Sequence, residues 1–81
     1  MISPAQCRAA RALLHLQQRD FADRAGVARR TLADFENEVR RPFDRTLRDI
    51  RTALEDHGVI FLDADDDAGP GVRLRTDPGS G

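Results

Sequence analysis

The stretch QRDFADRAGVARRTLADFEN, Gln18–Asn37, decides the fold. It predicts two short helices, at about 18–25 and 29–37, joined by a tight turn at Gly26, where a residue without Cβ can adopt φ > 0. Ala22 supplies the small side chain that two steeply crossing helices need. Apolar residues at helical spacing point inward: Phe21, Ala25, Val27, Leu32 and Phe35. The stretch therefore predicts a helix-turn-helix.

The outer side of the second helix carries residues suited to contact with base edges: Arg29, Arg30, Ala33 and Asp34. An arginine can bond both O6 and N7 of guanine, and Asp34 could either accept from a cytosine amine or orient an arginine. The alternative is a generic helical hairpin whose two arginines lie on a solvated face.

The chain resembles the phage-repressor and Cro-type helix-turn-helix group, also called the Xre family, over about residues 5–54. The resemblance rests on these segments: Leu16-Gln17-Gln18, Phe21-Ala22, Arg24-Ala25-Gly26-Val27, Thr31-Leu32, Phe35-Glu36, Arg41-Pro42 and Thr46-Leu47. It implies a mainly α fold, a four- to five-helix repressor-like bundle. It further implies base contacts by Arg29, Arg30 and Asp34. Contacts with the DNA backbone are expected from Gln18, which could touch a base instead, and from Thr31, Arg40 and Arg41. Thr31 could instead cap locally, and the Arg40-Arg41 pair could simply be solvated.

Two positions depart from the pattern of this family. Ala28 stands where a Ser or Thr usually caps the third helix, so that cap is missing. Glu38 stands where a Gly usually follows the Glu-Asn pair, which affects the exit from the helix and adds a negative charge near DNA. Both departures bear on affinity more than on fold.

A first helix is predicted from Ser3-Pro4-Ala5-Gln6, which has the pattern of a capping box, to about Leu16. Its inward stripe is expected to contain Cys7, Ala10, Leu13 and Leu14, with Arg8 and Arg11 facing out. A fourth helix is expected after Asp44 as its N-cap, ending at Gly58. We expect Glu36 to pair with a nearby arginine.

The pattern changes after Gly58. Val59–Leu62 is an apolar run with β propensity, 63–71 favours turns, and Val72–Arg75 alternates apolar and basic residues. These segments predict a DNA-binding domain at 1–58, a β-hairpin at 59–75 and a frayed tail at 76–81. The hairpin could pack on the fourth helix or pair with a second copy. We predict the second, through Ile60, Phe61, Leu62, Val72 and Leu74.

Composition limits the possible functions. The 81 residues suffice for one domain, and the net charge of −1 hides a body with 11 Arg against 9 acidic residues before an acidic C-terminal part. The single cysteine, Cys7, fits a reducing compartment. The series Asp63, Asp65, Asp67 fails as a calcium loop, because Ala68 replaces the required glycine and Leu74 the final glutamate. We expect no cofactor, no metal, no membrane span and no enzymatic activity.

The sequence thus predicts a sequence-specific transcription regulator that binds double-stranded DNA. The expected form is a homodimeric repressor on a near-palindromic operator, cytoplasmic and associated with the nucleoid. The alternative is an antitoxin-like module whose hairpin binds a partner protein.

Overall fold

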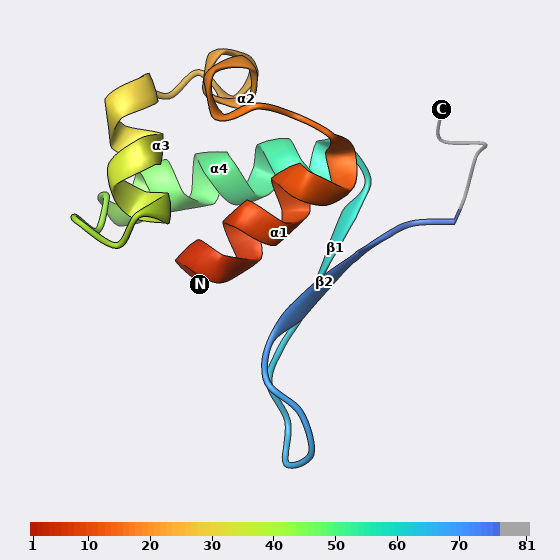
Figure 1. Cartoon of the computed structure of the whole chain (residues 1–81). Coiled ribbons are helices and arrows are strands. Elements are labelled where there is room, and N and C mark those ends of the chain that lie inside the picture. Colours follow the sequence, from red (N-terminus) through yellow and green to blue (C-terminus); the bar gives the residue numbers. More distant parts are fainter. Residues whose placement is uncertain (77–81) are drawn as a thin grey trace.

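Four helices and a two-stranded sheet follow one another along residues 1–76, the part of the chain that this computed structural model describes (Figure 1). In order they are α1 (Pro4–Leu14), α2 (Gln18–Ala25), α3 (Arg29–Glu36), α4 (Asp44–Asp56), β1 (Val59–Leu62) and β2 (Gly71–Leu74). The predicted class, a mainly α helix-turn-helix bundle with a C-terminal hairpin, is confirmed. The predicted frayed tail, except for Thr76, falls outside the described residues.

The start of α1 is fixed by the capping box expected from the sequence. The Ser3 hydroxyl accepts from the Gln6 backbone N–H at 3.0 Å, and the Gln6 side chain accepts from the Ser3 N–H at 2.9 Å. The helix stops at Leu14 rather than near Leu16, because His15 takes the left-handed conformation with φ 57°. The expected C-terminal end was therefore about two residues too late.

Two side chains of α1 face differently from the prediction. Arg11 lies four residues after Cys7 and so shares its inward side, where it contacts Glu36 instead of solvent. Leu13 is three residues beyond Ala10 but on the edge of the stripe, and 40% of it is exposed. The buried side of α1 is therefore narrower and more polar than expected.

The turn between α2 and α3 confirms the role predicted for Gly26. Gly26 has φ 72°, and the following Val27 N–H donates to the Ala22 carbonyl at 3.0 Å. Helix α3 begins at Arg29 with Ala28 in the cap position, and no side chain caps it. The two helices cross at a steep angle, and α2 lies above α4 (Figure 1).

The exit from α3 shows why glycine is usual at position 38. Glu38 has φ 60°, a left-handed conformation that disfavours side chains with a Cβ. The Asp34 carbonyl then accepts from the N–H groups of Val39 and Arg40, at 2.8 and 3.2 Å. Helix α4 follows at Asp44, which is its first residue rather than its cap; Phe43 takes the cap position.

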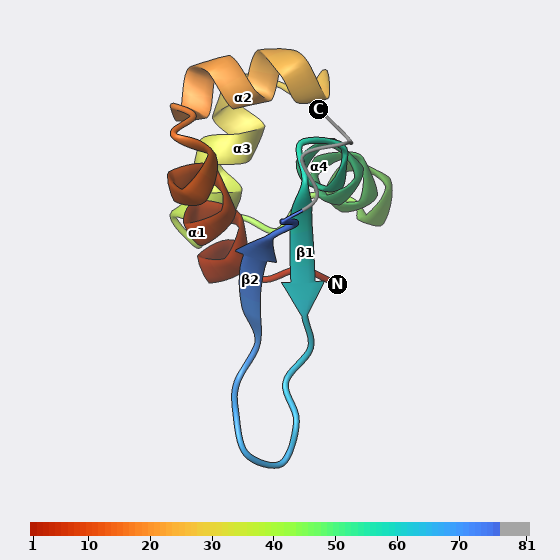
Figure 2. The same ribbon diagram turned by 90° about the vertical axis from the view of Figure 1, so that its right-hand side faces the viewer.

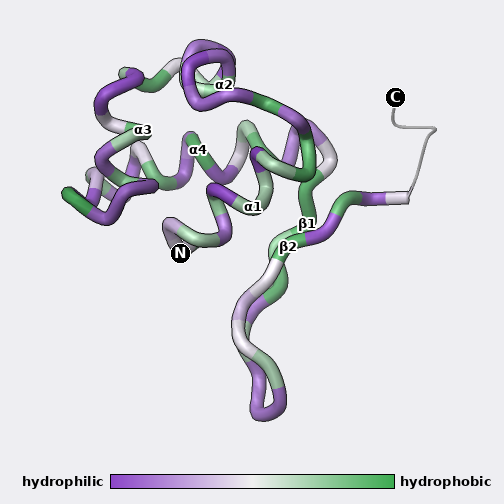
Figure 3. The backbone as a smooth tube through the Cα atoms, in the orientation of Figure 1, coloured by the Kyte–Doolittle hydropathy of each residue, from purple (hydrophilic) through white to green (hydrophobic). Residues whose placement is uncertain are grey.

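The core lies where the four helices meet. Phe21 of α2, Leu32 of α3 and Ile50 and Leu54 of α4 have no exposed surface. Figure 3 shows that the tip of the hairpin is hydrophilic, whereas apolar residues recur along its strands. Apolar burial is the main stabilising contribution to this bundle.

The hairpin packs against its own helices. Strand β2 lies beside α1 and β1 beside α4 (Figure 2). The antiparallel register pairs Val59 with Leu74 and Phe61 with Val72, so these four side chains share one face. Val59 is buried there, and Phe61 and Val72 pack against the core.

Gln6 connects the hairpin to α1. Its side-chain NH₂ donates to the carbonyls of Leu62 and Gly71, at 3.3 and 3.0 Å, across the end of the strand pair. The residue is only 7% exposed. One glutamine thus both caps α1 and holds the hairpin on the bundle.

Candidate DNA-binding surface

An open groove runs between the N-terminal end of α2 and the outer side of α3. Its lining residues are Gln17, Gln18, Arg19, Arg29, Arg30 and Ala33. Four of them were predicted from the sequence to contact DNA, whereas Gln17 and Arg19 were not. Both are neighbours of Gln18 at the start of a helix expected to touch DNA, and this position could have indicated them. The groove brings three arginines and two amides onto one surface.

Arg29 is held by a carboxylate of the preceding helix. Its Nε donates to Asp23 Oδ1 at 3.1 Å and its Nη2 to Asp23 Oδ2 at 2.8 Å. The hydrogen bonds from Arg29 hold the pKa of Asp23 below its usual value. Asp23 was not singled out in the sequence, because its approach to Arg29 depends on the turn at Gly26.

Arg30 is more exposed than Arg29, whose side chain is 60% exposed. Its Nε lies 3.4 Å from Asp34 Oδ1, one helical turn away, and 88% of the Arg30 side chain is exposed. The Asp34 side chain is only 22% exposed, so it packs against the helix while Arg30 extends into solvent. Arg30 therefore projects from α3, and its ion pair in the described part of the chain is a loose one.

A smaller groove continues from α3 toward the loop that follows it. It is lined by Arg30, Thr31, Asp34, Arg40 and Pro42. The half-buried Thr31 lies in its wall, and Arg40 reaches it from the loop. Four of the residues predicted to contact DNA thus gather here: Arg30, Thr31, Asp34 and Arg40.

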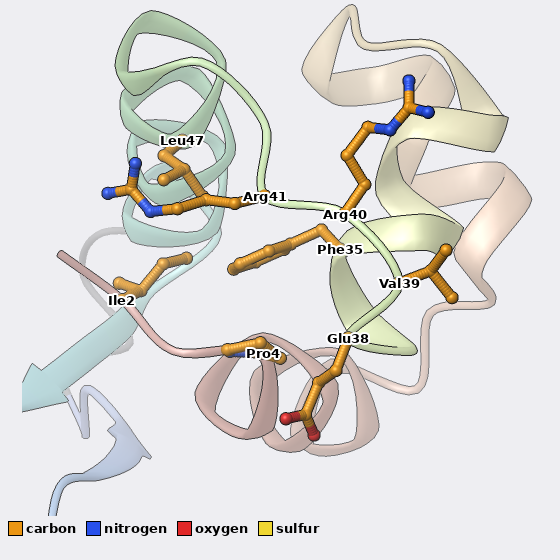
Figure 4. A pocket seen from close by; sticks show the side chains of 8 residues that line it. All are labelled: Ile2, Pro4, Phe35, Glu38, Val39, Arg40, Arg41 and Leu47. Atoms are coloured by element: carbon orange, nitrogen blue, oxygen red, sulfur yellow. The ribbon is translucent and has the colours of Figure 1, made fainter.

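Arg40 and Arg41 point to opposite sides of their loop (Figure 4). Arg40 turns toward α3. Arg41 turns toward α4, and its Nη1 donates to Asp44 Oδ1 at 3.1 Å. Of the two, Arg40 therefore lies nearer the groove with Arg30.

A mixed pocket of about 270 Å³ lies behind this loop. Figure 4 shows the Phe35 ring between Ile2 and Leu47, with Glu38 and Val39 at the rim. Ile2, Phe35 and Leu47 belong to the hydrophobic core. The pocket is therefore a surface depression above core residues, between the N-terminal segment, α3 and α4.

The inner side of α3 is fixed by a buried carboxylate. Glu36 has no exposed surface; Arg11 donates to both its oxygens, at 2.7 and 2.6 Å. The Cys7 thiol and the Gln18 amide donate as well, at 3.1 and 3.0 Å. The prediction that Glu36 pairs with an arginine is confirmed. No described buried side-chain nitrogen or oxygen lacks a hydrogen-bond partner.

The protonation states in this network follow from its geometry. Burial alone would raise the pKa of Glu36, but the hydrogen bonds from Arg11, Gln18 and Cys7 outweigh it and lower that pKa. Burial and the hydrogen bond to Glu36 raise the pKa of the Cys7 thiol, which stays protonated and unreactive. Glu36 is thus an anion that three helices share.

Gln18 belongs to both the buried network and the groove. Its NH₂ group is bonded to Glu36, and the residue is half-buried at the first position of α2. The contact with Glu36 orients the side chain expected to touch DNA.

Other kinds of site were sought in the same residues. Within 1–76, no group of three or more His, Cys, Asp or Glu side chains gathers as a metal site would require. No helix of this part of the chain has the length and apolar character needed to cross a membrane.

The fold and this surface define a helix-turn-helix DNA-binding protein. The sequence model of the Xre/Cro-like helix-turn-helix family matches residues 8–55, which is more than half of the chain. The chain therefore belongs to this family and is a DNA-binding transcriptional regulator. A comparison with curated proteins found no match.

Proposed function

We propose that this protein is a homodimeric repressor that inserts α3 into the major groove of a near-palindromic operator. The observation that carries the proposal is the groove in which Arg19, Arg29 and Arg30 line one surface with two glutamines. Arginine forms two parallel hydrogen bonds with guanine and also pairs with phosphate, so this surface suits both tasks.

The base contacts are assigned to the outer side of α3. Arg29 and Arg30 bond to guanine, Ala33 offers a methyl group to a thymine, and Asp34 either accepts from cytosine or restrains Arg30. The 3.4 Å contact between Arg30 Nε and Asp34 Oδ1 supports the second role for Asp34.

The backbone contacts are assigned to residues around that helix. Gln18 and Thr31 flank the bases, and Arg40 and Arg41 approach phosphates from the loop. Arg40 shares a groove with Arg30, whereas Arg41 is paired with Asp44. We therefore expect Arg40 to contribute more than Arg41.

The dimer is assigned to the hairpin. Ile60 and Leu62 share the face opposite to the buried Val59, and Leu62 is 38% exposed. Leu74 lies on the same face as Val59 but is also 38% exposed. Phe61 and Val72, also expected at the contact, are engaged with their own core. Two strands alone form a marginal sheet, and pairing with a second copy would extend it to four.

The resulting dimer would contact two half-sites about one helical turn apart. Bound over a promoter, it would block access of the polymerase. Such a protein works in the cytoplasm, at the nucleoid.

The test is fluorescence anisotropy on DNA from upstream of its own gene and on unrelated DNA, across a salt series. Arg30→Ala should remove the preference for one sequence. Arg40→Ala should weaken binding to both DNAs and reduce the salt slope by about 1, because one phosphate contact is lost. Arg41→Ala is the matched control and should change less.

The outcomes separate the possibilities. Equal binding to both DNAs would place the operator elsewhere and call for selection from genomic fragments. Absence of DNA binding at low salt, together with copurification of an unrelated protein, would favour the partner-module alternative.

The dimer is tested by sedimentation of the wild type, Leu62→Lys and Asp66→Asn. Both substitutions raise the net charge by one, Leu62→Lys by adding a cation and Asp66→Asn by removing an anion, but only the first is on the proposed contact. A monomeric Leu62→Lys with a dimeric Asp66→Asn supports the hairpin dimer. A Leu62→Lys protein that remains dimeric at micromolar concentration contradicts it.

A further inference from the structure

The pair formed by Arg29 and Asp23 leaves a defined part of the arginine free. A guanidinium has five N–H donors arranged in one plane. Asp23 takes the edge formed by Nε and Nη2, at 3.1 and 2.8 Å. The remaining edge, formed by Nη1 and Nη2, points away from the carboxylate with two parallel N–H groups. Their spacing matches O6 and N7 of guanine.

The restraint comes from the helix-turn-helix itself. Asp23 lies in the last turn of α2, and Arg29 is the first residue of α3. The left-handed Gly26 between them reverses the chain and brings the two side chains together. Arg29 is thus tied to a second helix, whereas within residues 1–76 the ion pair of Arg30 is a 3.4 Å contact with Asp34 of its own helix.

Restraint by a carboxylate has two consequences for binding. It removes rotamer freedom from Arg29 before DNA arrives, which lowers the entropic cost of a directed contact. It also places a negative charge beside the arginine, which weakens attraction to phosphate at any sequence. Both effects favour specificity over total affinity.

We propose that Asp23 is a positioning residue that aims Arg29 at a guanine, so that each half-site requires one G·C pair at a fixed position. The proposal rests on the proposed function and adds to it the base that Arg29 recognises and the residue that enforces the choice.

The experiment is selection from a random-sequence double-stranded DNA library by the full chain, followed by sequencing. The wild type should enrich a motif with guanine at one position per half-site, preferred by about 5- to 150-fold. Arg29→Ala should remove the preference at that position. Asp23→Asn should reduce the preference there, leave the other positions intact and raise affinity for unselected DNA.

Asp20→Asn is the matched control. Asp20 is close enough to raise the pKa of Arg29 by its charge, yet among residues 1–76 the Arg29 guanidinium has hydrogen bonds only to Asp23. Asp20→Asn should therefore raise affinity for unselected DNA while keeping the guanine preference. Asp23→Glu, which retains the carboxylate, should recover part of that preference.

The results distinguish failure of this inference from failure of the proposed function. If the wild type enriches no sequence, both fail. If it enriches a motif but Asp23→Asn keeps the full guanine preference, only the role of Asp23 is overturned. The same holds if Asp23→Asn and Arg29→Ala alter different positions, or if Asp20→Asn loses the preference as Asp23→Asn does.

Discussion

The two sides of α3 both pair an arginine with a carboxylate, in opposite surroundings. On the inner side Arg11 lies 2.6 Å from Glu36, and their side chains are 17% and 0% exposed. On the outer side Arg30 lies 3.4 Å from Asp34, and they are 88% and 22% exposed. Removing one partner of a buried pair leaves an uncompensated charge, whereas an exposed pair is screened by water.

The difference in burial indicates separate roles for the two sides of α3. The inner carboxylate joins α1, α2 and α3 through Arg11, Gln18 and Cys7, and so fixes the position of α3. The outer arginines remain accessible at the groove. The position of α3 is therefore set independently of the arginines on its outer side.

The largest effect is expected from Glu36→Ala. It leaves the buried end of Arg11 without its partner and should lower the free energy of unfolding by about 3–5 kcal/mol. Urea denaturation followed by circular dichroism measures it. Glu55→Ala, which breaks the exposed pair with Arg51, is the control and should cost at most about 1 kcal/mol. Equal losses would mean that burial does not make the Arg11–Glu36 pair more important for stability than the exposed pair.

A pH series isolates the charge of Glu36. Because its pKa is lowered on folding, the ionised carboxylate stabilises the protein above the unfolded-state pKa of about 4.3, and this contribution is lost as pH falls through the lower folded-state value. The difference in stability between wild type and Glu36→Gln should therefore be constant near neutral pH and shrink below about pH 4.3. A difference that is unchanged down to pH 2.5 would rule out this linkage.

Much of the fold was predictable because its signals are local. The capping box, the turn at Gly26 and the inward apolar residues each depend on neighbours a few positions apart. The end of α1 was misplaced because a left-handed His15 has no strong sequence signal. Arg11 was assigned to solvent because helical periodicity marks a face but does not reveal a buried carboxylate on another helix.

The site was predictable only in outline. The resemblance pointed to Arg29 and Arg30 through their position in the motif. It could not show that Asp23 holds one of them, or that Arg40 and Arg41 diverge. Those facts depend on the crossing of helices and on the path of a loop, which side-chain type and spacing do not encode.

Gln6→Glu tests whether a second buried polar contact behaves like the inner side of α3. The variant keeps an acceptor for the capping box but replaces the donor to Leu62 and Gly71 by a carboxylate facing two carbonyls. Carbonyl oxygens that lose their hydrogen-bond donor in this way lower the stability by about 1–3 kcal/mol. Hydrogen exchange should show faster opening of β1 and β2, with α2 and α3 unaffected. Uniformly faster exchange would mean that the hairpin and the bundle unfold together.

Glu38→Gly probes the backbone at the exit of α3. Because a left-handed conformation costs a residue with a Cβ roughly 1–2 kcal/mol, relief of that cost minus the added flexibility of glycine should give about 1 kcal/mol of extra stability. Glu38→Ala removes the same charge without relieving the backbone. Thermal denaturation should therefore separate the two variants, and a glycine variant no more stable than the alanine variant would show that φ at this position is not limiting.

The smallest effect is expected from Asp34→Asn, the outer counterpart of the change at Glu36. The pair joins residues one helical turn apart, with the arginine first, which is the less favourable order on a helix. The loss should be at most about 0.5 kcal/mol by urea denaturation. Affinity for unselected DNA should rise, because a negative charge beside Arg30 disappears. A loss comparable to that of Glu36→Ala would mean that Asp34 also holds α3 in place, and the separation between an anchoring side and a recognition side would no longer stand.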